Sequence, residues 1–193
     1  MRKFFILILF CSFLSCNSNN NLPKNTIVYG EYKIPIKTAA GAPLETIMDI
    51  DGNDREKLIF NYHLFTFTDT EKSELIAIPE PPYIVYIAIT ENLFGKKIDM
   101  RNPELLENGS KIYLITRIVE EMGIGYILAS DGERTGTHRG DIETGTFQLD
   151  YKDGKCTLTI DAELRDGTLF SCRYEGELIT SGMESVFQQF MEL

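Results

Sequence analysis

The C-terminal third of the chain alternates apolar and polar residues with the period of two that half-buried strands show. Two such runs, 147–151 and 156–164, flank Asp153-Gly154, a dipeptide preferred in two-residue hairpin turns. The register that this turn sets joins apolar residues in pairs: Tyr151 with Cys156, Leu149 with Leu158 and Phe147 with Ile160. All six then lie on one face, so the pattern predicts an antiparallel hairpin with that face toward the core.

A third strand follows the turn at Asp166-Gly167. A three-residue loop over 165–167, with glycine in the left-handed conformation, keeps its apolar residues on the same face. Cys172 then lies opposite Ile160 or Ala162, so Cys156 is about 13 Å further along the sheet at 3.3 Å per residue. Because a disulfide needs Cα atoms within about 7 Å, we predict two buried free thiols, with a disulfide as the alternative.

The remaining apolar runs also predict strands, at 28–36, 58–68, 74–78, 83–90, 97–100, 111–119 and 124–129. The run 83–90 is apolar on both faces, which places it centrally in its sheet. The short run 97–100 is a candidate edge strand. Asn102-Pro103 predicts a single helical turn through Leu106. About nine short strands in one domain, 27–193, predict an all-β antiparallel sandwich, with a lipocalin-like barrel as the alternative.

The last thirteen residues, Ser181 to Leu193, change to a helical period. The apolar positions are Met183, Val186, Phe187, Phe190 and Met191. Ser181 and Glu184 match a capping box, so we predict a short amphipathic helix that covers an open end or edge of the sandwich. A helix that docks on a partner or lies on a membrane is the alternative, although its polar side lacks the Lys and Arg of interfacial helices.

The first sixteen residues have the order of a secretory signal peptide. Arg2 and Lys3 precede an apolar run over 4–14, which is shorter than the roughly 20 residues of a membrane span. Ser15 and Cys16 close the run, and an Asn- and Ser-rich segment follows. We therefore predict a signal peptide over 1–15.

This segment resembles the signal peptides of bacterial lipoproteins, in a relaxed form with Phe13 and Leu14 before Ser15. The resemblance implies cleavage before Cys16, lipid on Cys16 and anchorage in a membrane of the cell envelope. Residues 16–26 have the composition of a flexible tether. A non-acidic Asn17 is similar to the pattern of outer-membrane sorting. Cleavage without lipid, leaving a soluble secreted protein, is the alternative.

The chain carries a net charge of −10, and without Arg2 and Lys3 its 17 basic side chains stand against 29 acidic ones, a net −12. No basic stripe remains, which excludes nucleic acid as an expected partner. An acidic surface also disfavours docking of the domain itself on anionic lipid.

The C-terminal hairpins resemble those of uncharacterised envelope lipoproteins of Bacteroides-type bacteria. The resemblance rests on 145–147, 155–164, 166–170 and 174–176. It implies an envelope β-sandwich and carries no catalytic residue with it.

Clustered carboxylates would suit calcium, and the chain has one such cluster: Asp49, Asp51, Asn53, Asp54 and Glu56. An EF-hand counted from Asp49 needs Gly sixth and Glu twelfth, and Asp54 and Phe60 stand there instead. We therefore assign no metal or other cofactor and expect a polar turn, with calcium bound in another geometry by Asp49, Asp51, Asn53 and Asp54 as the alternative.

The longest irregular stretch is predicted over 130–146, which is rich in Gly and charge. Its candidate ligand contacts are Arg134, His138, Arg139 and Asp141, where cationic side chains would hold a carboxylate or sugar hydroxyls. Residues 139–141 also spell the integrin-recognition tripeptide, a motif short enough to arise by chance. A solvated loop without a ligand is the alternative.

No nucleophile elbow, zinc-protease helix or phosphate-binding glycine loop occurs in the sequence. His63 lies in an alternating run beside Tyr62 and Phe65, which indicates a half-buried side chain. We therefore expect a lipid-anchored binding or scaffolding module with a protein or carbohydrate partner. The alternatives are a secreted or periplasmic hydrolase that uses two of the many carboxylates, and a structural subunit of an envelope complex.

Overall fold

The computed structural model describes residues 22–49, 57–75, 81–101, 111–118, 122–129 and 142–180. Eleven strands lie within these ranges: β1 Thr26–Tyr29, β2 Tyr32–Pro35, β3 Thr38–Asp49, β4 Lys57–Thr68, β5 Tyr83–Thr90, β6 Ile98–Asp99, β7 Lys111–Ile118, β8 Met122–Ala129, β9 Ile142–Lys152, β10 Lys155–Leu164 and β11 Leu169–Glu177. The described helices are a single turn, α1 Lys72–Leu75, and a 3-10 turn, η1 Glu91–Leu93.

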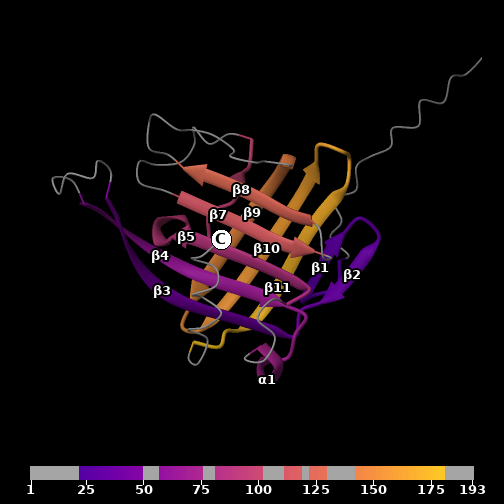
Figure 1. Ribbon diagram of the computed structural model, residues 1–193, viewed down its shortest axis with the longest axis horizontal. Helices are drawn as coiled ribbons and strands as arrows, with labels where there is room; N and C mark the ends of the chain where they lie inside the picture. Colours follow the sequence, from indigo (N-terminus) through magenta and orange to yellow (C-terminus); the bar gives the residue numbers. More distant parts are fainter. Residues whose placement is uncertain are drawn as a thin grey trace, which may run out of the picture.

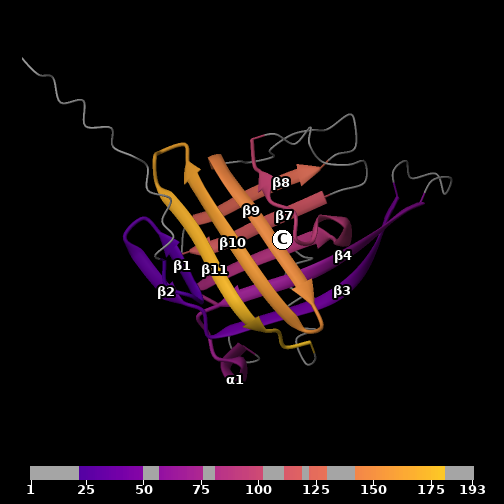
Figure 2. The same ribbon diagram turned by 180° about the vertical axis from the view of Figure 1, so that it is seen from behind.

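The strands form two antiparallel sheets. Sheet A has the order β2-β1-β11-β10-β9-β6, and sheet B the order β3-β4-β5-β7-β8. The sheets face each other and their strands cross (Figures 1 and 2). The predicted all-β sandwich is thus confirmed, and in the described part of the chain the strands do not close into the alternative barrel.

The core fills the space between the two inner faces. Sheet B contributes Phe65, Phe67, Val85, Ile87 and Leu114, among others, and sheet A contributes Ile27, Phe147, Leu149, Ile160 and Phe170. All ten are at most 1% exposed. Burial of one such aliphatic or aromatic side chain stabilises the fold by roughly 1.5–3 kcal/mol, so this layer supplies the main driving force.

The predicted C-terminal registers are confirmed. Tyr151 pairs with Cys156, Leu149 with Leu158 and Phe147 with Ile160, as the Asp-Gly turn requires. At the next turn the amide of Leu164 donates to the carbonyl of Thr168, and Gly167 has a φ of +83°, so residues 165–167 form the predicted three-residue loop. Cys172 lies opposite Ile160.

Two sheet positions were also predicted correctly. The doubly apolar run 83–90 is β5, third of the five strands in sheet B. The short run 97–100 contains β6, which closes one edge of sheet A. The predicted turn at 102–106 and the C-terminal helix at 181–193 lie outside the described residues.

The single strand predicted over 28–36 is wrong. It is a hairpin, in which Tyr29 pairs with Tyr32 across Gly30 and Glu31. Gly30 has a φ of +55°, a conformation that glycine adopts without steric cost, and it turns the chain within two residues.

The strand predicted from Glu74 is wrong at its start, because residues 72–75 form α1. A four- or five-residue apolar run is too short for its period to decide between helix and strand. Residues 76–80 lie outside the described part of the chain.

β3 was not predicted, because its first half contains Gly41 and Pro43, which disfavour strands. Both are tolerated here for a reason. β3 is the edge of sheet B, where a strand can contain proline. A Cβ on Gly41 would lie 2.7 Å from Cδ1 of Leu178 and 3.2 Å from the Phe65 ring, so these buried side chains would have to shift to admit a larger residue.

Candidate functional site

Most residues that the sequence nominated lie outside the described ranges. These are Cys16, Asp51, Asn53, Asp54, Arg134, His138, Arg139 and Asp141. Asp49 is described, and it is the last residue of β3, paired with Lys57, rather than part of a loop. Within the described ranges, no three His, Cys, Asp or Glu side chains lie close enough to share a metal ion.

The segment 130–141 joins the two sheets. Along the chain it follows β8, the edge strand of sheet B, and precedes β9 of sheet A. The irregular stretch predicted over 130–146 is wrong at its C-terminal end, because residues 142–146 belong to β9. Ile142 is 7% exposed and pairs with Leu164, which fixes the start of β9.

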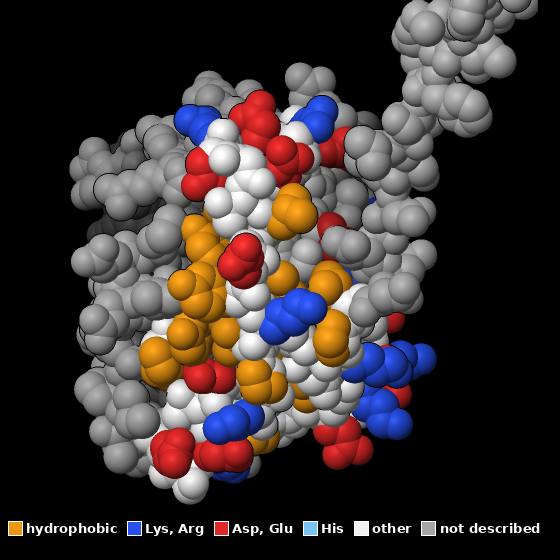
Figure 3. All heavy atoms as spheres, turned by 90° about the vertical axis from the view of Figure 1, so that its right-hand side faces the viewer, with side chains coloured by type: hydrophobic (Ala, Val, Ile, Leu, Met, Phe, Trp, Pro, Cys, Tyr) orange, Lys and Arg blue, Asp and Glu red, His pale blue; other side chains and the backbone are white. Residues whose placement is uncertain are grey.

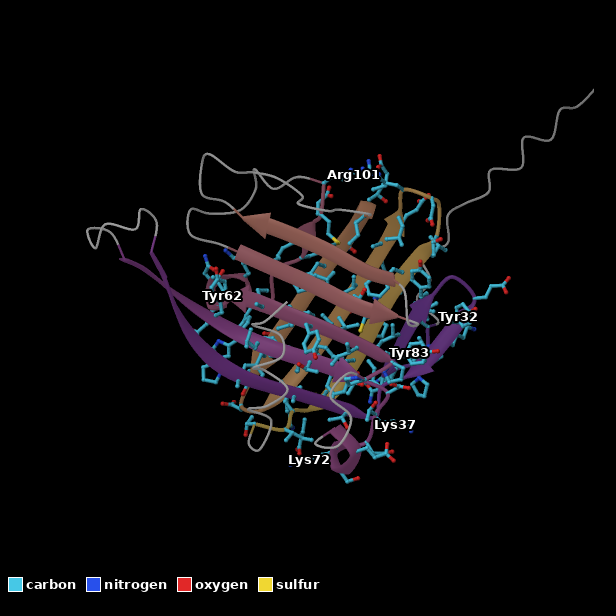
Figure 4. The ribbon with its side chains drawn as sticks, viewed as in Figure 1. Tyr32, Lys37, Tyr62, Lys72, Tyr83 and Arg101 are labelled. Carbon is cyan, nitrogen blue, oxygen red and sulfur yellow. The ribbon has the colours of Figure 1, made fainter. Side chains whose placement is uncertain are left out.

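Charged side chains lie where β9 begins. Nε of Arg165 is 4.0 Å from a carboxylate oxygen of Glu143, and both side chains are exposed. The amide of Met100 donates to the carbonyl of Gly145, which ties the chain before Arg101 to the same end of sheet A (Figure 4). Strand β9, which follows residues 130–141 along the chain, is therefore paired with β10 from its first residue, the buried Ile142.

A second cluster surrounds His63 on β4. Its ring centroid is 5.3 Å from that of Phe94 and 5.7 Å from that of Tyr151, and Phe65 contacts all three rings. Phe94 follows η1, and Tyr151 is near the end of β9, so the cluster joins sheet B to sheet A. The amide of Gly95 donates to the carbonyl of Leu149 and holds this connection in place.

The His63 side chain is 12% exposed, and its Nδ1 is 3.3 Å from a carboxylate oxygen of Glu91. Burial lowers the pKa of His63 below its ordinary value of 6.5, and the Glu91 charge opposes that shift. An imidazole beside a carboxylate is the arrangement of a general base. Here the other neighbours of the imidazole are aromatic rings, so its position matches the predicted half-buried packing residue.

We expect His63 to make stability depend on pH. Its folded pKa is lowered, so the unfolded chain binds the proton more readily, and the contribution of His63 is complete above about pH 6.5 and declines as the pH falls below it. His63→Phe, which keeps an aromatic ring in the cluster, should lose this component. Urea unfolding of both chains at pH 7.5 and 5.5 tests it, and equal pH dependence in the two would contradict it.

A polar cluster lies on the outer face of sheet A. Arg173 donates from one nitrogen to the carbonyl of Ile160 at 3.0 Å and from the other to Asp161 at 2.5 Å. The hydroxyl of Ser171 donates to the second carboxylate oxygen of Asp161 at 3.1 Å. These side chains thus hydrogen-bond to one another and to the backbone across the β10–β11 pair, which gives them a structural role.

Cys156 and Cys172 are free and buried, as predicted. Burial raises the pKa of Cys156 to about 12, with a further contribution from the charge of Asp150. Burial also raises the pKa of Cys172. Because the thiolate is the reactive form, both side chains are core residues of low reactivity.

We therefore expect neither thiol to react with iodoacetamide at pH 8 in the folded protein, and both to react in denaturant without any reductant. Peptide mapping by mass spectrometry reads out the two positions separately. Modification of Cys156 in the native protein would contradict its burial. If the denatured chain reacted only after addition of a reductant, the two thiols would be paired rather than free.

Apolar side chains form a band on the side of the molecule where β1 and β2 lie (Figure 3). Tyr32 is 58% exposed on β2, and Tyr83 at the start of β5 is part-exposed. Strand β2 has four residues and contains Lys33 and Pro35, features that protect an edge strand from pairing with another chain. None of the described helices is long and apolar enough to span a membrane.

The fold thus defines an all-β protein, a two-sheet antiparallel sandwich. No known protein family, no characterised protein and no solved structure matches the chain.

The His63 cluster was not predicted as a unit. The alternating pattern placed Tyr151 on the core face and indicated a half-buried His63, but no local signal links β4 to η1 and the end of β9. The pair of Asp161 and Ser171 follows directly from the register of their hairpin.

Proposed function

We propose that the protein is a lipid-anchored module of the cell envelope that binds or scaffolds a partner without catalysis. The observation that carries the proposal is the N-terminal sequence. A basic pair, the apolar run 4–14 and Ser15-Cys16 have the order of a lipoprotein signal, and an Asn- and Ser-rich segment follows.

The start of the domain supports a short tether. Strand β1 begins at Thr26, ten residues after Cys16. A flexible chain of that length has a typical reach of about 15–20 Å, which would hold the sandwich close to a bilayer. The acidic domain is not attracted to anionic headgroups, so under this proposal the lipid on Cys16 supplies the membrane attachment and the outer membrane is its location.

We propose residues 131–141 of the segment 130–141 as the contact surface. Binding residues often lie on loops that a rigid scaffold positions, and this segment ends in the paired strand β9. Arg134, His138 and Arg139 add cationic groups to an otherwise acidic chain. Such groups suit a carboxylate or sugar hydroxyls, and thus an acidic protein surface or a carbohydrate.

Formaldehyde cross-linking in the native host tests this surface. The wild-type chain should give cross-linked species of defined mass, and a variant with Arg134, His138 and Arg139 replaced by serine should lose them. A matched control replaces Lys152 and Lys155, which are exposed at the 153–154 turn, and should keep them. Species that persist in the triple variant would contradict the assignment of the contact surface.

A further inference from the structure

The outer face of sheet B, which points away from sheet A, is buried. Its side chains from β4 and β5 alternate with the core residues Phe65, Phe67, Val85 and Ile87. The outward ones are Tyr62, Leu64, Thr66, Ile84, Tyr86 and Ala88, each at most 5% exposed. A sheet face in contact with water carries polar, exposed side chains instead.

No described strand or helix lies over this face. Sheet A packs against the other side of sheet B, and α1 is a single turn at the margin of the sandwich (Figures 1 and 2). The hydroxyl of Thr66, which is buried on the same face, has no hydrogen-bond partner among the described residues, as expected beneath an apolar cover.

The end of the described chain lies at one edge of this face. After β11 the chain leaves sheet A, and Leu178 enters the core. Ile179 then forms a parallel bridge to Ala40 on β3, the edge strand of sheet B, with its amide donating to the carbonyl of Ala39 at 3.0 Å. Residue 180 is therefore fixed beside sheet B, and the capping box at Ser181 and Glu184 follows at once.

We infer that residues 181–193 form an amphipathic helix that packs on the outer face of sheet B as a third layer of the domain. The lengths agree. Twelve helical residues extend about 18 Å at 1.5 Å each. Three strand spacings, from β3 across to β7, cover about 14 Å.

The chemistry of the two surfaces also agrees. The helical period places Met183, Val186, Phe187 and Phe190 on one side of the segment. The facing positions of β4 and β5 are aliphatic, aromatic or hydroxylic and carry no charge. This inference replaces the predicted cover over an end or edge of the sandwich, and it does not depend on the lipid tether or on the segment 130–141.

The test is photo-cross-linking of the full-length protein with p-benzoylphenylalanine at position 187, and separately at position 190. Each change keeps a large aromatic side chain, so the fold should persist, and a failure to fold at one position leaves the other. We expect cross-links within one chain, recovered on peptides that contain 62–68 or 84–90. The same probe at Gln188, on the polar side of the segment, should not mark these peptides.

Every other result overturns the inference. A product of doubled mass would make a second copy of the chain the occupant of the face. A cross-link to sheet A would place the segment at an end or edge of the sandwich. No cross-link from either position would mean that the segment does not pack on the domain.

Discussion

Replacing Phe147 with alanine should lower the free energy of unfolding by about 3–5 kcal/mol. Phe147 is 1% exposed, and it pairs with Ile160 on β10 and with Ile98 on β6. Its ring therefore lies in the core beneath the point where β9 pairs with both β10 and the short edge strand β6. Removal leaves a cavity that three paired strands cannot close, and the loss is a large share of the 5–15 kcal/mol that stabilises a typical domain.

Urea unfolding followed by fluorescence of the tyrosines measures the change. Thr157→Ala is the matched control, since Thr157 is exposed on β10 and its truncation should change the free energy by no more than about 0.5 kcal/mol. A loss below 1 kcal/mol for Phe147→Ala would contradict the central place of this ring.

Gly145→Ala should lower the free energy of unfolding by about 1–3 kcal/mol, because its new Cβ would meet backbone atoms. That atom would lie 2.7 Å from the carbonyl oxygen of Asp161 and 3.0 Å from Cα of Ala162. Gly145 and Ala162 are paired, so relief of the clash must separate β9 from β10. The same region leads into the irregularity between Glu163 and Leu164.

Gly176→Ala is the control on the same sheet. Its Cβ would lie 2.8 Å from Oη of Tyr174, the far end of a part-exposed side chain that can move away. If the Tyr174 side chain moves, it loses its hydrogen bond to the carbonyl of Glu177, which costs about 0.5–1.5 kcal/mol. The alanine also restricts the backbone of the unfolded chain, which stabilises the fold by about 0.4–1 kcal/mol and offsets much of that loss. If urea unfolding shows the same loss of unfolding free energy for Gly145→Ala and Gly176→Ala, the predicted clash between a Cβ at position 145 and the backbone of β10 would be contradicted.

The sequence predicted the C-terminal hairpins correctly because two independent signals agree there. The Asp153-Gly154 turn and the alternation of apolar residues specify one register, and a shift by one residue would turn Leu149 and Leu158 to the solvent. The same reasoning gave the bulged turn at Gly167 and the separation of the two cysteines. The run 83–90 was placed centrally because only a strand covered on both faces is apolar throughout.

Features that depend on distant contacts could not be predicted. β3 is a strand because it pairs along its whole length with β4, and the close neighbour of Gly41 is Leu178, which is 137 residues away. In the ring cluster, His63 of β4 contacts Tyr151 of β9 directly, and both contact Phe94 in the loop after η1. In both places tertiary packing overrides weak local preference.

The candidate contact residues of 130–141 were selected by composition and charge. The structure adds that these residues lie, along the chain, between β8 of sheet B and β9 of sheet A, and that β9 is paired with β10 from Ile142. The run 83–90 was predicted to be apolar on both faces, but the buried outer face of sheet B was not identified as one surface, because its residues come from two segments, β4 and β5, that pair only in the fold.

Intact mass of the protein from membranes of its native host, beside a Cys16→Ala variant, tests the central proposal most directly. The account predicts a chain that begins at Cys16 and carries a diacylglycerol, and a variant that is neither lipidated nor retained in the membrane fraction. A mature chain without lipid, unchanged in mass and location apart from the substitution itself, would contradict the tether and make a soluble secreted protein the better description.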